Sequence, residues 1–302
     1  MKSAGRSDLP RFPARVIGTF GRTSLLEDDA GASWSAVRRG RRSDLVVGDR
    51  VVASASAPGQ AAVESIEPRT SLLYRADAFR TKELAANIDQ VIIVFASRPT
   101  FNLWFLWKAL VAARAADIEG IVVRNKTDLD DGAEAAQTVV AQIGRLGWRT
   151  AAVSARSRPD ETVATLQQIT QGKSSLLVGQ SGMGKSTLLN LLVPEAQART
   201  REYSERLDLG KQTTTAARWF RLPYGGAVVD TPGFQEFGLA HLTPAQIVAG
   251  FPEFASHLGS CRFADCRHLV EPDCAIRAAV TAGEVASSRY DFYQSLIAGS
   301  TR

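Results

Sequence analysis

The stretch Gly179-Gln180-Ser181-Gly182-Met183-Gly184-Lys185-Ser186 decides the fold of this chain, because it fills every fixed position of the phosphate-binding pattern G-x-x-x-x-G-K-[ST]. Residues 174–178 before it are short, apolar and end on valine, and residues 187–192 behind it have helical character. A strand, a glycine loop and a helix in this order aim backbone N–H groups and a helix N-terminus at phosphate oxygens. We therefore predict a nucleotide-binding α/β domain rather than an ordinary glycine-rich turn.

The last two residues of this loop carry the side chains that are expected to contact the phosphates and the metal ion. Lys185 is expected to reach the β- and γ-phosphates, and the hydroxyl of Ser186 is expected to ligate Mg²⁺. The nucleotide-binding residues predicted here are Gly179, Gln180, Ser181, Gly182, Met183, Gly184, Lys185, Ser186 and Thr187.

Composition limits the class of protein. The 302 residues are 45% hydrophobic and 22% charged, which is typical of two or three folded domains and excludes a disordered or fibrous chain. No apolar run approaches the ~18 residues that span a bilayer, and residues 1–6 lack the apolar segment of a signal peptide. We therefore expect a cytoplasmic protein with no membrane contact, and we expect a monomer.

Positive charge is concentrated near the N-terminus. The net charge is +5, and residues 1–75 hold twelve Lys and Arg against eight Asp and Glu, so most of the excess lies in the first quarter. Such a region is typical of proteins that bind a polyanion. The densest run is Arg38, Arg39, Arg41 and Arg42, which taken alone is also compatible with a solvated loop.

Short strands separated by turn signals follow a basic tail. Their spacing is typical of a small all-β barrel, and an OB-type barrel of about sixty residues fits, although periodicity leaves an SH3-like barrel open. OB barrels bind nucleic acid with one face and its flanking loops. The predicted strands are 15–20, 33–37, 49–53 and 61–66.

After residue 68 the pattern changes to alternating strands and helices, which is typical of a doubly wound α/β domain. Residues 91–96 and 118–123 are predicted as buried strands, with a helix over residues 102–116 between them. The tetrapeptide Asn125-Lys126-Thr127-Asp128 follows the second strand directly and matches the guanine-reading pattern N-K-x-D.

Asp128 is expected to select the base. Its carboxylate can accept from both N1–H and the exocyclic amine of guanine, while Asn125 and the stem of Lys126 organise and cover the ring. Adenine has no such donor pair and would leave the carboxylate unpaired, which allows discrimination of order 10⁴.

A second base-site signal supports the first. The predicted strand over residues 150–153 ends in Ser154-Ala155, a pair whose backbone commonly contacts the guanine O6 in GTPases. Both signals therefore sit at the carboxyl ends of strands, where open α/β sheets bind ligands.

The parts that sense the γ-phosphate come later in the chain. Residues 210–215 hold a threonine cluster that resembles switch I, in which Thr214 is expected to present a hydroxyl to Mg²⁺. A predicted strand over residues 226–229 delivers Asp230 toward the same metal, and the amide of Gly233 is expected to meet the γ-phosphate. The predicted magnesium ligands are thus Ser186, Thr214 and Asp230.

The order of these motifs shows a circular permutation. Ordinary GTPases begin with the phosphate loop and end with the base motifs, whereas here Asn125 precedes Gly179. Termini of compact domains often lie close together, so the same sheet can form from a rotated chain. We expect a basic tail over 1–12, an OB-fold RNA-binding domain over 13–70, a permuted GTPase domain over 71–238 and a helical zinc-binding domain over 239–302.

The C-terminal part contains a predicted metal site. All three cysteines of the chain, Cys261, Cys266 and Cys274, lie close to His268, and three thiolates with one imidazole form the ligand set of a closed structural zinc site. The spacing C-x₄-C-x-H-x₅-C is unusual, so three buried small residues beside a surface histidine stay possible, and His257 is a minor alternative ligand. Helices are predicted over 244–251, 274–282 and 287–297, so the region is expected to depend on metal.

The complete arrangement resembles the RsgA family of small-subunit ribosome biogenesis GTPases, also called YjeQ or YloQ. The resemblance is carried by the guanine tetrapeptide, the phosphate loop, the threonine cluster, Asp230-Thr231-Pro232-Gly233-Phe234 and the cysteine and histidine quartet. It implies a bacterial protein that binds GTP and GDP, one Zn²⁺ and Mg²⁺. It also implies contact with the small ribosomal subunit and its rRNA during late maturation, and release after subunit-stimulated hydrolysis. A permuted GTPase acting on another RNA or on a protein is the alternative.

One position departs from the family pattern. The family usually has histidine where this chain has Gln212, and Phe234 stands where many signalling GTPases place a water-orienting glutamine. We therefore expect slow intrinsic hydrolysis, with Gln212, Lys185 and Thr214 as the catalytic residues and Gln212 as the group that orients water. A ribosomal group in place of Gln212 is the competing interpretation.

Overall fold

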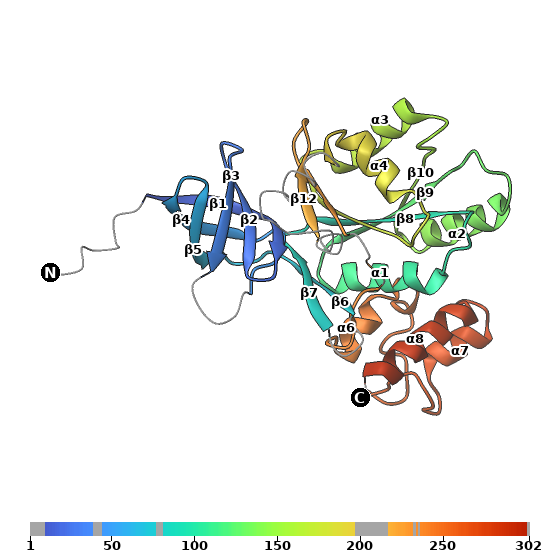
Figure 1. Cartoon of the computed structure of the whole chain (residues 1–302). Coiled ribbons are helices and arrows are strands. Elements are labelled where there is room, and N and C mark those ends of the chain that lie inside the picture. Colours follow the sequence, from blue (N-terminus) through green and yellow to red (C-terminus); the bar gives the residue numbers. More distant parts are fainter. Residues whose placement is uncertain are drawn as a thin grey trace.

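The structure is a computed structural model that describes residues 10–38, 44–76, 81–196, 217–231, 234 and 236–300. A β-barrel stands at one end, an α/β sheet covered by helices forms the middle, and the C-terminal helices lie against the α1 side of that sheet (Figure 1). The barrel thus lies far from the C-terminal region, and both contact the central domain. Within the described residues, no helix is long and apolar enough to cross a membrane.

Five strands form the barrel, and their pairing identifies its type. β1 pairs antiparallel with both β2 and β4, which closes the barrel, while β3 pairs parallel with β5. This is the five-stranded closure of an OB-type barrel, so the prediction is confirmed and the SH3-like alternative is wrong. The strands are β1 (Arg11–Phe20), β2 (Thr23–Asp28), β3 (Ser33–Arg38), β4 (Arg50–Ala57) and β5 (Gln60–Ile66).

The sequence interpretation missed β2, which lies only two residues after β1. Gly21, with φ of 59°, supplies the left-handed backbone that a two-residue hairpin loop requires. Leu25 and Leu26 are both buried, so alternation of apolar and polar residues is lost at the centre of the strand. The turn glycine was the signal that could have revealed it.

The central sheet has the strand order β10-β9-β8-β11-β13-β12, with all neighbours parallel except β12, which runs antiparallel to β13. The strand that precedes the phosphate loop, β11, therefore lies at the centre between β8 and β13, although these three are far apart in sequence. The strands are β8 (Gln90–Ala96), β9 (Glu119–Asn125), β10 (Arg149–Ala152), β11 (Ser174–Val178), β12 (Arg218–Arg221) and β13 (Ala227–Asp230), and the hairpin β6 (Leu72–Ala76) and β7 (Thr81–Ala86) leads into them.

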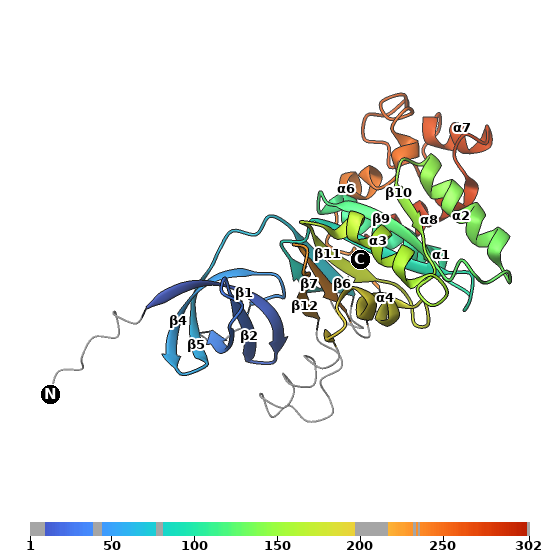
Figure 2. The ribbon, with the colours of Figure 1, turned by 90° about the horizontal axis from the view of Figure 1, so that it is seen from above.

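Helices cover both faces of this sheet, as Figure 2 shows from above. β8 is buried along its whole length because alternate side chains enter two different cores. Val91 and Ile93 join the core that contains α1 and α2, whereas Ile92 and Val94 join the core that contains α3 and α4. The helices are α1 (Leu103–Ala115), α2 (Ala133–Arg145), α3 (Pro159–Thr170) and α4 (Lys185–Leu192).

The barrel and the central sheet are joined by β1 and β12, which pair at Gly18 and Arg218. Side chains reinforce this junction: the guanidinium of Arg15 lies 4.4 Å from the ring centroid of Trp219, and Arg221 Nη2 lies 2.8 Å from the carboxylate of Glu27. The barrel is therefore attached to β12, and β12 pairs with β13, the strand that ends at Asp230.

The C-terminal region packs through aromatic residues against α1. Phe292 lies 5.3 Å from Trp107 and 5.9 Å from Phe251 between ring centroids. Buried Arg289 pairs with Glu253 at 2.6 Å beneath the ring of Phe251. The elements of the C-terminal region are α6 (Pro244–Ala249), the 3₁₀ turn η1 (Pro252–Phe254), α7 (Ala275–Thr281) and α8 (Ser287–Ser300).

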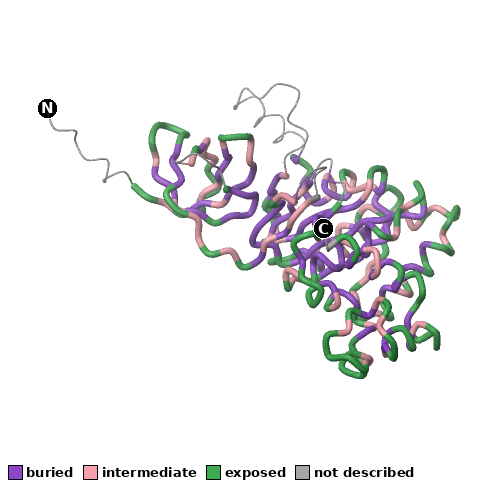
Figure 3. Tube along the Cα trace, turned by 90° about the horizontal axis from the view of Figure 1, so that it is seen from below, coloured by how far each residue is buried: buried purple, intermediate pink, exposed green. Residues whose placement is uncertain are grey.

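These helices confirm the predicted positions, but long loops separate them and the helical content of the region is modest. In Figure 3 the strands of the central sheet are mostly buried, while much of the C-terminal part is intermediate or exposed. The loop from residue 255 to residue 274 holds all four residues of the cysteine and histidine quartet and contributes little to the aromatic core.

Candidate nucleotide and metal sites

The phosphate loop joins β11 to α4 and needs glycine at three positions, the first of which is Gly179, where a Cβ would lie 2.3 Å from the carbonyl oxygen of Val94. Gly182 and Gly184 have φ of 77° and 96°, a backbone conformation that costs other residues free energy. A Cβ on Gly184 would also lie 2.2 Å from Nδ2 of Asn125. The loop is therefore built around the asparagine of the base motif.

Lys185 begins α4 and reaches back over the loop. Its Nζ donates to the carbonyl oxygens of Gly179 and Gln180, at 2.5 Å and 3.0 Å. Burial lowers the pKa of Lys185, and the nearby Asp230 opposes that shift. Burial likewise raises the pKa of Asp230, and the charge of Lys185 offsets part of it. A half-buried cation and carboxylate thus lie beside the loop, as phosphate and metal binding requires.

Asn125 fixes the base motif to the phosphate loop. Its side chain is buried, its Nδ2 donates to the carbonyl of Met183 at 3.0 Å, and its Oδ1 accepts from the backbone N–H of Ala155 at 3.2 Å. Lys126 adopts φ of 57° and donates from Nζ to the carbonyl of Arg98 at 3.0 Å. One asparagine therefore ties together the ends of β9, β10 and β11.

Asp128 is exposed, and its carboxylate accepts a hydrogen bond from the hydroxyl of Ser154. This bond is the main cause of the lowered pKa of Asp128, so the group stays ionised well below neutral pH. Thr127 points the other way, because its hydroxyl donates to the carbonyl of Val153 at 3.1 Å. The tetrapeptide thus presents an ionised acceptor at its final residue.

A cavity of about 480 Å³ lies between the base motifs and the phosphate loop. Motifs that the permutation separates in sequence therefore line one space, as the sequence predicted. Leu129 and Arg156 also line it and were not predicted, although each directly follows a predicted base motif. The lining residues are Asn125, Lys126, Asp128, Leu129, Ala155, Arg156, Ser181, Gly182, Gly184, Lys185, Ser186 and Thr187.

Other predicted binding residues contact the protein around the site and do not line the cavity. Gln180 accepts at Oε1 from the backbone N–H of Asn102, at 2.6 Å, and so ties the loop to the start of α1. The side chain of Met183 is buried in the core that contains α4. Thr231, next to Asp230, donates to the carbonyl of Leu177 at 3.3 Å. Gln212, Thr214 and Gly233 lie outside the described residues, so their predicted roles stay predictions.

Phe234 lies beyond the switch residues and is buried. Its ring contacts Phe105 on α1 and Phe237, with centroid distances of 6.0 Å and 4.8 Å. The side chain at this position therefore belongs to the aromatic core and has no hydrogen-bonding group to offer a water molecule.

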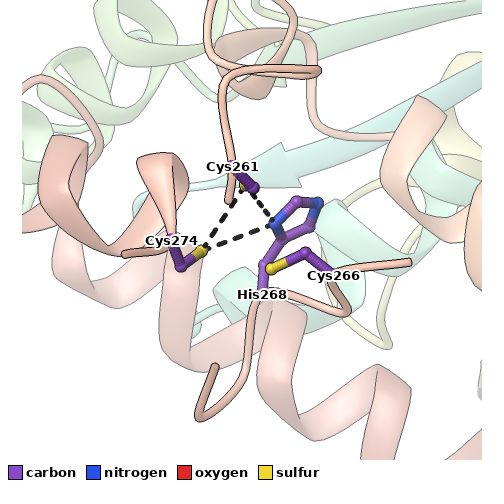
Figure 4. A group of neighbouring side chains, drawn as sticks. All are labelled: Cys261, Cys266, His268 and Cys274. Atoms are coloured by element: carbon purple, nitrogen blue, oxygen red, sulfur yellow. Dashed lines mark hydrogen bonds between the residues drawn. The ribbon is translucent and has the colours of Figure 1, made fainter. Parts of the chain in front are cut away.

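The four predicted metal ligands converge in the C-terminal loops, as Figure 4 shows. His268 Nδ1 lies 3.5 Å from Sγ of both Cys261 and Cys274, those two sulfurs are 4.0 Å apart, and the four donor atoms, with Cys266, lie within 4.8 Å of one another. A tetrahedral zinc ion with ordinary bond lengths has ligand separations of about 3.5 to 3.8 Å. The donor set and its spacing fit such an ion.

Neighbouring groups fix the loops that carry these ligands. Tyr290 donates from its hydroxyl to the carbonyl of His268 at 2.7 Å, and Tyr293 donates to the carbonyl of Arg267 at 2.8 Å. Glu271 accepts from the backbone N–H of Arg267 and of Leu269, at 3.0 Å and 2.8 Å. Burial acts against ionisation of Glu271, but these and other backbone N–H bonds lower its pKa to about 2.

The remaining histidines have other surroundings. His257 Nε2 lies 3.5 Å from the carboxylate of Glu284, and the ring of His241 lies 4.2 Å from that of Tyr74. Burial lowers the pKa of His268, which favours the neutral imidazole that binds metals. Burial raises the pKa of Cys266 to about 12, so a metal ion has to displace the thiol proton when it binds. The cluster of Cys261, Cys266, His268 and Cys274 can therefore hold a metal ion such as zinc.

Known proteins resemble the chain along almost its whole length. A model of the RsgA GTPase family matches residues 66–240. A protein of Ralstonia nicotianae, named small ribosomal subunit biogenesis GTPase RsgA, is 45% identical over 93% of this chain and 90% of its own. A protein of Paraburkholderia phytofirmans with the same name is 43% identical over 97% of both chains.

Two solved structures share the architecture. The crystal structure of YjeQ from Thermotoga maritima superposes with a TM-score of 0.73 and 29% identity over 97% of this chain and 99% of that one. YloQ, described as a circularly permuted GTPase, gives a TM-score of 0.70 and 25% identity over 99% and 98% of the two chains. The matched span, the identities and the shared permuted fold together place this chain in the RsgA GTPase family, as a circularly permuted, GTP-hydrolysing enzyme.

Proposed function

We propose that this protein binds the small ribosomal subunit and its rRNA, assists late maturation, and leaves after the subunit stimulates GTP hydrolysis. The observation that carries the proposal is the relation to proteins named for small-subunit biogenesis, which covers 93% of the chain in one relative and 97% in another. The similarity to these relatives therefore includes the barrel and the metal region as well as the nucleotide domain. We place the activity in the cytoplasm, with the protein acting as a monomer.

In the nucleotide site, Asp128 reads the guanine and Lys126 covers one face of the ring. The amides of the loop from Gly179 to Gly184 bind the phosphates, and Lys185 adds positive charge at the β- and γ-phosphates. The support is the shared cavity, into which the base motif and the loop both face. Ser186, Asp230 and Thr214 would hold Mg²⁺, and the ion would supply charge neutralisation on the transferring phosphoryl group.

In the C-terminal region, Cys261, Cys266, His268 and Cys274 would bind one Zn²⁺. The ion has a structural role there, because four protein ligands leave no open position for substrate. The zinc ion would fix the loop around residue 270, so that this loop forms a rigid surface for the ribosomal partner. The hydrogen bonds from Tyr290 and Tyr293 support this role, since they anchor the same loop to α8.

Gln212 orients the attacking water once the subunit is bound. Its amide can both donate and accept, and buried Phe234 offers no alternative at the following switch. Gln212→Ala should leave GTP and subunit binding nearly intact and slow subunit-stimulated turnover by ~10²-fold. Stimulated turnover within about twofold of the wild type would exclude Gln212.

The barrel provides the electrostatic part of subunit binding. Arg22 is exposed on the loop between β1 and β2, and Arg38, the first residue of the predicted arginine run, lies at the end of β3. The rest of that run, Arg39, Arg41 and Arg42, lies outside the described residues. Loops and strands in these positions bind nucleic acid in OB barrels. Each contact between a basic side chain and an rRNA phosphate releases counterions, so the affinity must fall with salt.

Cosedimentation with purified small subunits tests the proposal. Binding should be tighter with a non-hydrolysable GTP analogue than with GDP, and it should weaken steeply as salt is raised. Replacing Arg38, Arg39, Arg41 and Arg42 by Ala should weaken subunit binding and leave GDP affinity unchanged. If the protein sedimented equally with large subunits, or if its binding to small subunits did not change with salt concentration, a different partner would be favoured.

A further inference from the structure

The turn between β10 and α3 places two further side chains beside the residues that read the base. The turn is fixed at both ends: Ser154 N donates to the hydroxyl of buried Thr162 at 3.2 Å, and Arg158 N donates to the carbonyl of Ser154 at 2.9 Å. Pro159 follows as the first residue of α3, where its restricted φ suits a helix start. Ser157 therefore has a defined position relative to Ser154.

The hydroxyl groups in this turn form a directed chain. An ionised carboxylate only accepts hydrogen bonds, so Ser154 must use its single hydroxyl proton on Asp128. Ser157 Oγ lies 2.5 Å from Ser154 Oγ. Because the proton of Ser154 is already engaged, Ser157 must be the donor and Ser154 the acceptor. The chain of donation therefore runs from Ser157 through Ser154 to Asp128.

Arg158 supports the same tetrapeptide from the other side. Its Nη2 donates to Thr127 Oγ1 at 2.9 Å, and Thr127 in turn donates to the carbonyl of Val153. The residue before Asp128 is thereby held to β10. The hydrogen bond from Ser154 is the main cause of the lowered pKa of Asp128, and the nearby hydroxyl of Ser157 and the charge of Arg158 act in the same direction.

We propose that Ser157 is a positioning residue for guanine recognition: it holds the hydroxyl of Ser154, which holds the Asp128 carboxylate in the orientation that accepts both guanine donors. The inference rests on the proposed guanine site. A carboxylate on an exposed loop rotates readily about its last side-chain bond, and two parallel hydrogen bonds to N1–H and the amine need one fixed plane. The serine chain supplies that constraint without touching the base.

Binding of GDP and of inosine diphosphate to the full-length protein tests this inference. Inosine keeps N1–H but lacks the exocyclic amine, so the ratio of the two affinities reports the second hydrogen bond. Ser157→Ala should lower the preference for GDP by about threefold to tenfold, the range for one net hydrogen bond. Ser157→Thr keeps the hydroxyl and should restore the preference, whereas Ser288→Ala, at an exposed serine on α8, should change nothing.

The pH dependence of GDP binding gives a second readout. The lowered pKa of Asp128 keeps the carboxylate ionised as pH falls, so wild-type binding should persist to low pH. In Ser157→Ala that pKa moves back up, and the acid loss of GDP binding should begin at higher pH. A role confined to folding would weaken GDP and inosine diphosphate equally and leave the acid limb in place, which would overturn the proposal.

Asp128→Asn separates this inference from the base site itself. If that variant keeps its guanine preference, the assignment of the base site fails. If it switches preference while Ser157→Ala matches the wild type in both readouts, the base site stands and the role of Ser157 is refuted.

Discussion

The nucleotide site and the metal cluster are built in opposite ways. The nucleotide site draws its residues from the ends of β9, β10, β11 and β13, which span more than a hundred positions. The side chain of Asn125 joins three of these ends by hydrogen bonds to backbone groups. The metal cluster draws its four ligands from fourteen consecutive positions, on loops with little core of their own. The first site is fixed by the topology of a buried sheet, and the second is fixed by its ligands and two tyrosines.

The two sites should therefore respond differently to substitutions. Damage to a single group in the nucleotide site should change its chemistry without unfolding it, because the surrounding sheet is buried on both faces. Loss of the metal should unfold its own loop, because binding free energy is folding free energy in such regions. Each should leave the other site working, since no ligand of the cluster lines the nucleotide cavity.

The largest effect is expected from Asp128→Asn. An amide in place of the carboxylate can accept from N1–H of xanthine and donate to its 2-oxo group, whereas it cannot accept from both donors of guanine. GTP affinity should fall by about 10³-fold or more while XTP affinity rises, within the range for a site built on hydrogen bonds. Competition binding with the two nucleotides measures this, and Asp130→Asn, an exposed carboxylate two residues on, is the matched control.

Unchanged thermal unfolding of Asp128→Asn would agree with a site fixed by topology. Normal GTP affinity in this variant would show that the base is read elsewhere.

Removal of two metal ligands should cause a large but local effect. Cys261→Ser with Cys266→Ser should abolish the one equivalent of zinc found by metal analysis, and limited proteolysis should then cut the loop around residue 270. His268→Ala should behave alike, while His257→Ala, which pairs with Glu284 instead, should keep its zinc. GDP affinity should stay within about twofold of the wild type throughout.

Full zinc retention in the double cysteine variant would remove the assignment of the metal ligands. Loss of GDP binding together with the metal would contradict the independence of the two regions.

A smaller effect is expected from pH, and it separates two carboxylates of the nucleotide site. Burial raises the pKa of Asp230 above its ordinary value, so protons compete with Mg²⁺ as pH falls toward that pKa. The hydrogen bond from Ser154 lowers the pKa of Asp128, so base recognition persists over the same range. As pH falls from neutral toward the raised pKa of Asp230, the Mg²⁺ concentration for half-maximal turnover should rise, while GDP affinity without Mg²⁺ changes little. A constant Mg²⁺ requirement would remove Asp230 from the metal site.

Motif residues and their positions at strand ends could be predicted from the sequence, because local patterns encode them. The strand, loop and helix around Lys185 are local, and so is the tetrapeptide that ends at Asp128. The permutation followed from motif order alone. These elements then came together because a parallel sheet places the carboxyl ends of its strands at one edge.

Features that depend on tertiary contact could not be predicted in this way. The bond from Asn125 to the carbonyl of Met183 joins residues 58 positions apart, and no periodicity signals it. The hairpin of β6 and β7 pairs Tyr74 and Arg75 with Glu83 and Lys82, a charged sequence that lacks the alternation of a half-buried strand. No local pattern marks Ser157 or Arg158, which the turn before α3 places beside Ser154 and Thr127.

Single-turnover GTP hydrolysis, measured with and without purified small ribosomal subunits, tests the central claim most directly. Phe234 is buried in an aromatic core and leaves the water without a partner at that position, so the isolated protein should hydrolyse GTP slowly. Small subunits should accelerate hydrolysis by about 10²-fold or more, and large subunits at the same concentration should not. Equal rates in the presence and absence of small subunits would contradict the account.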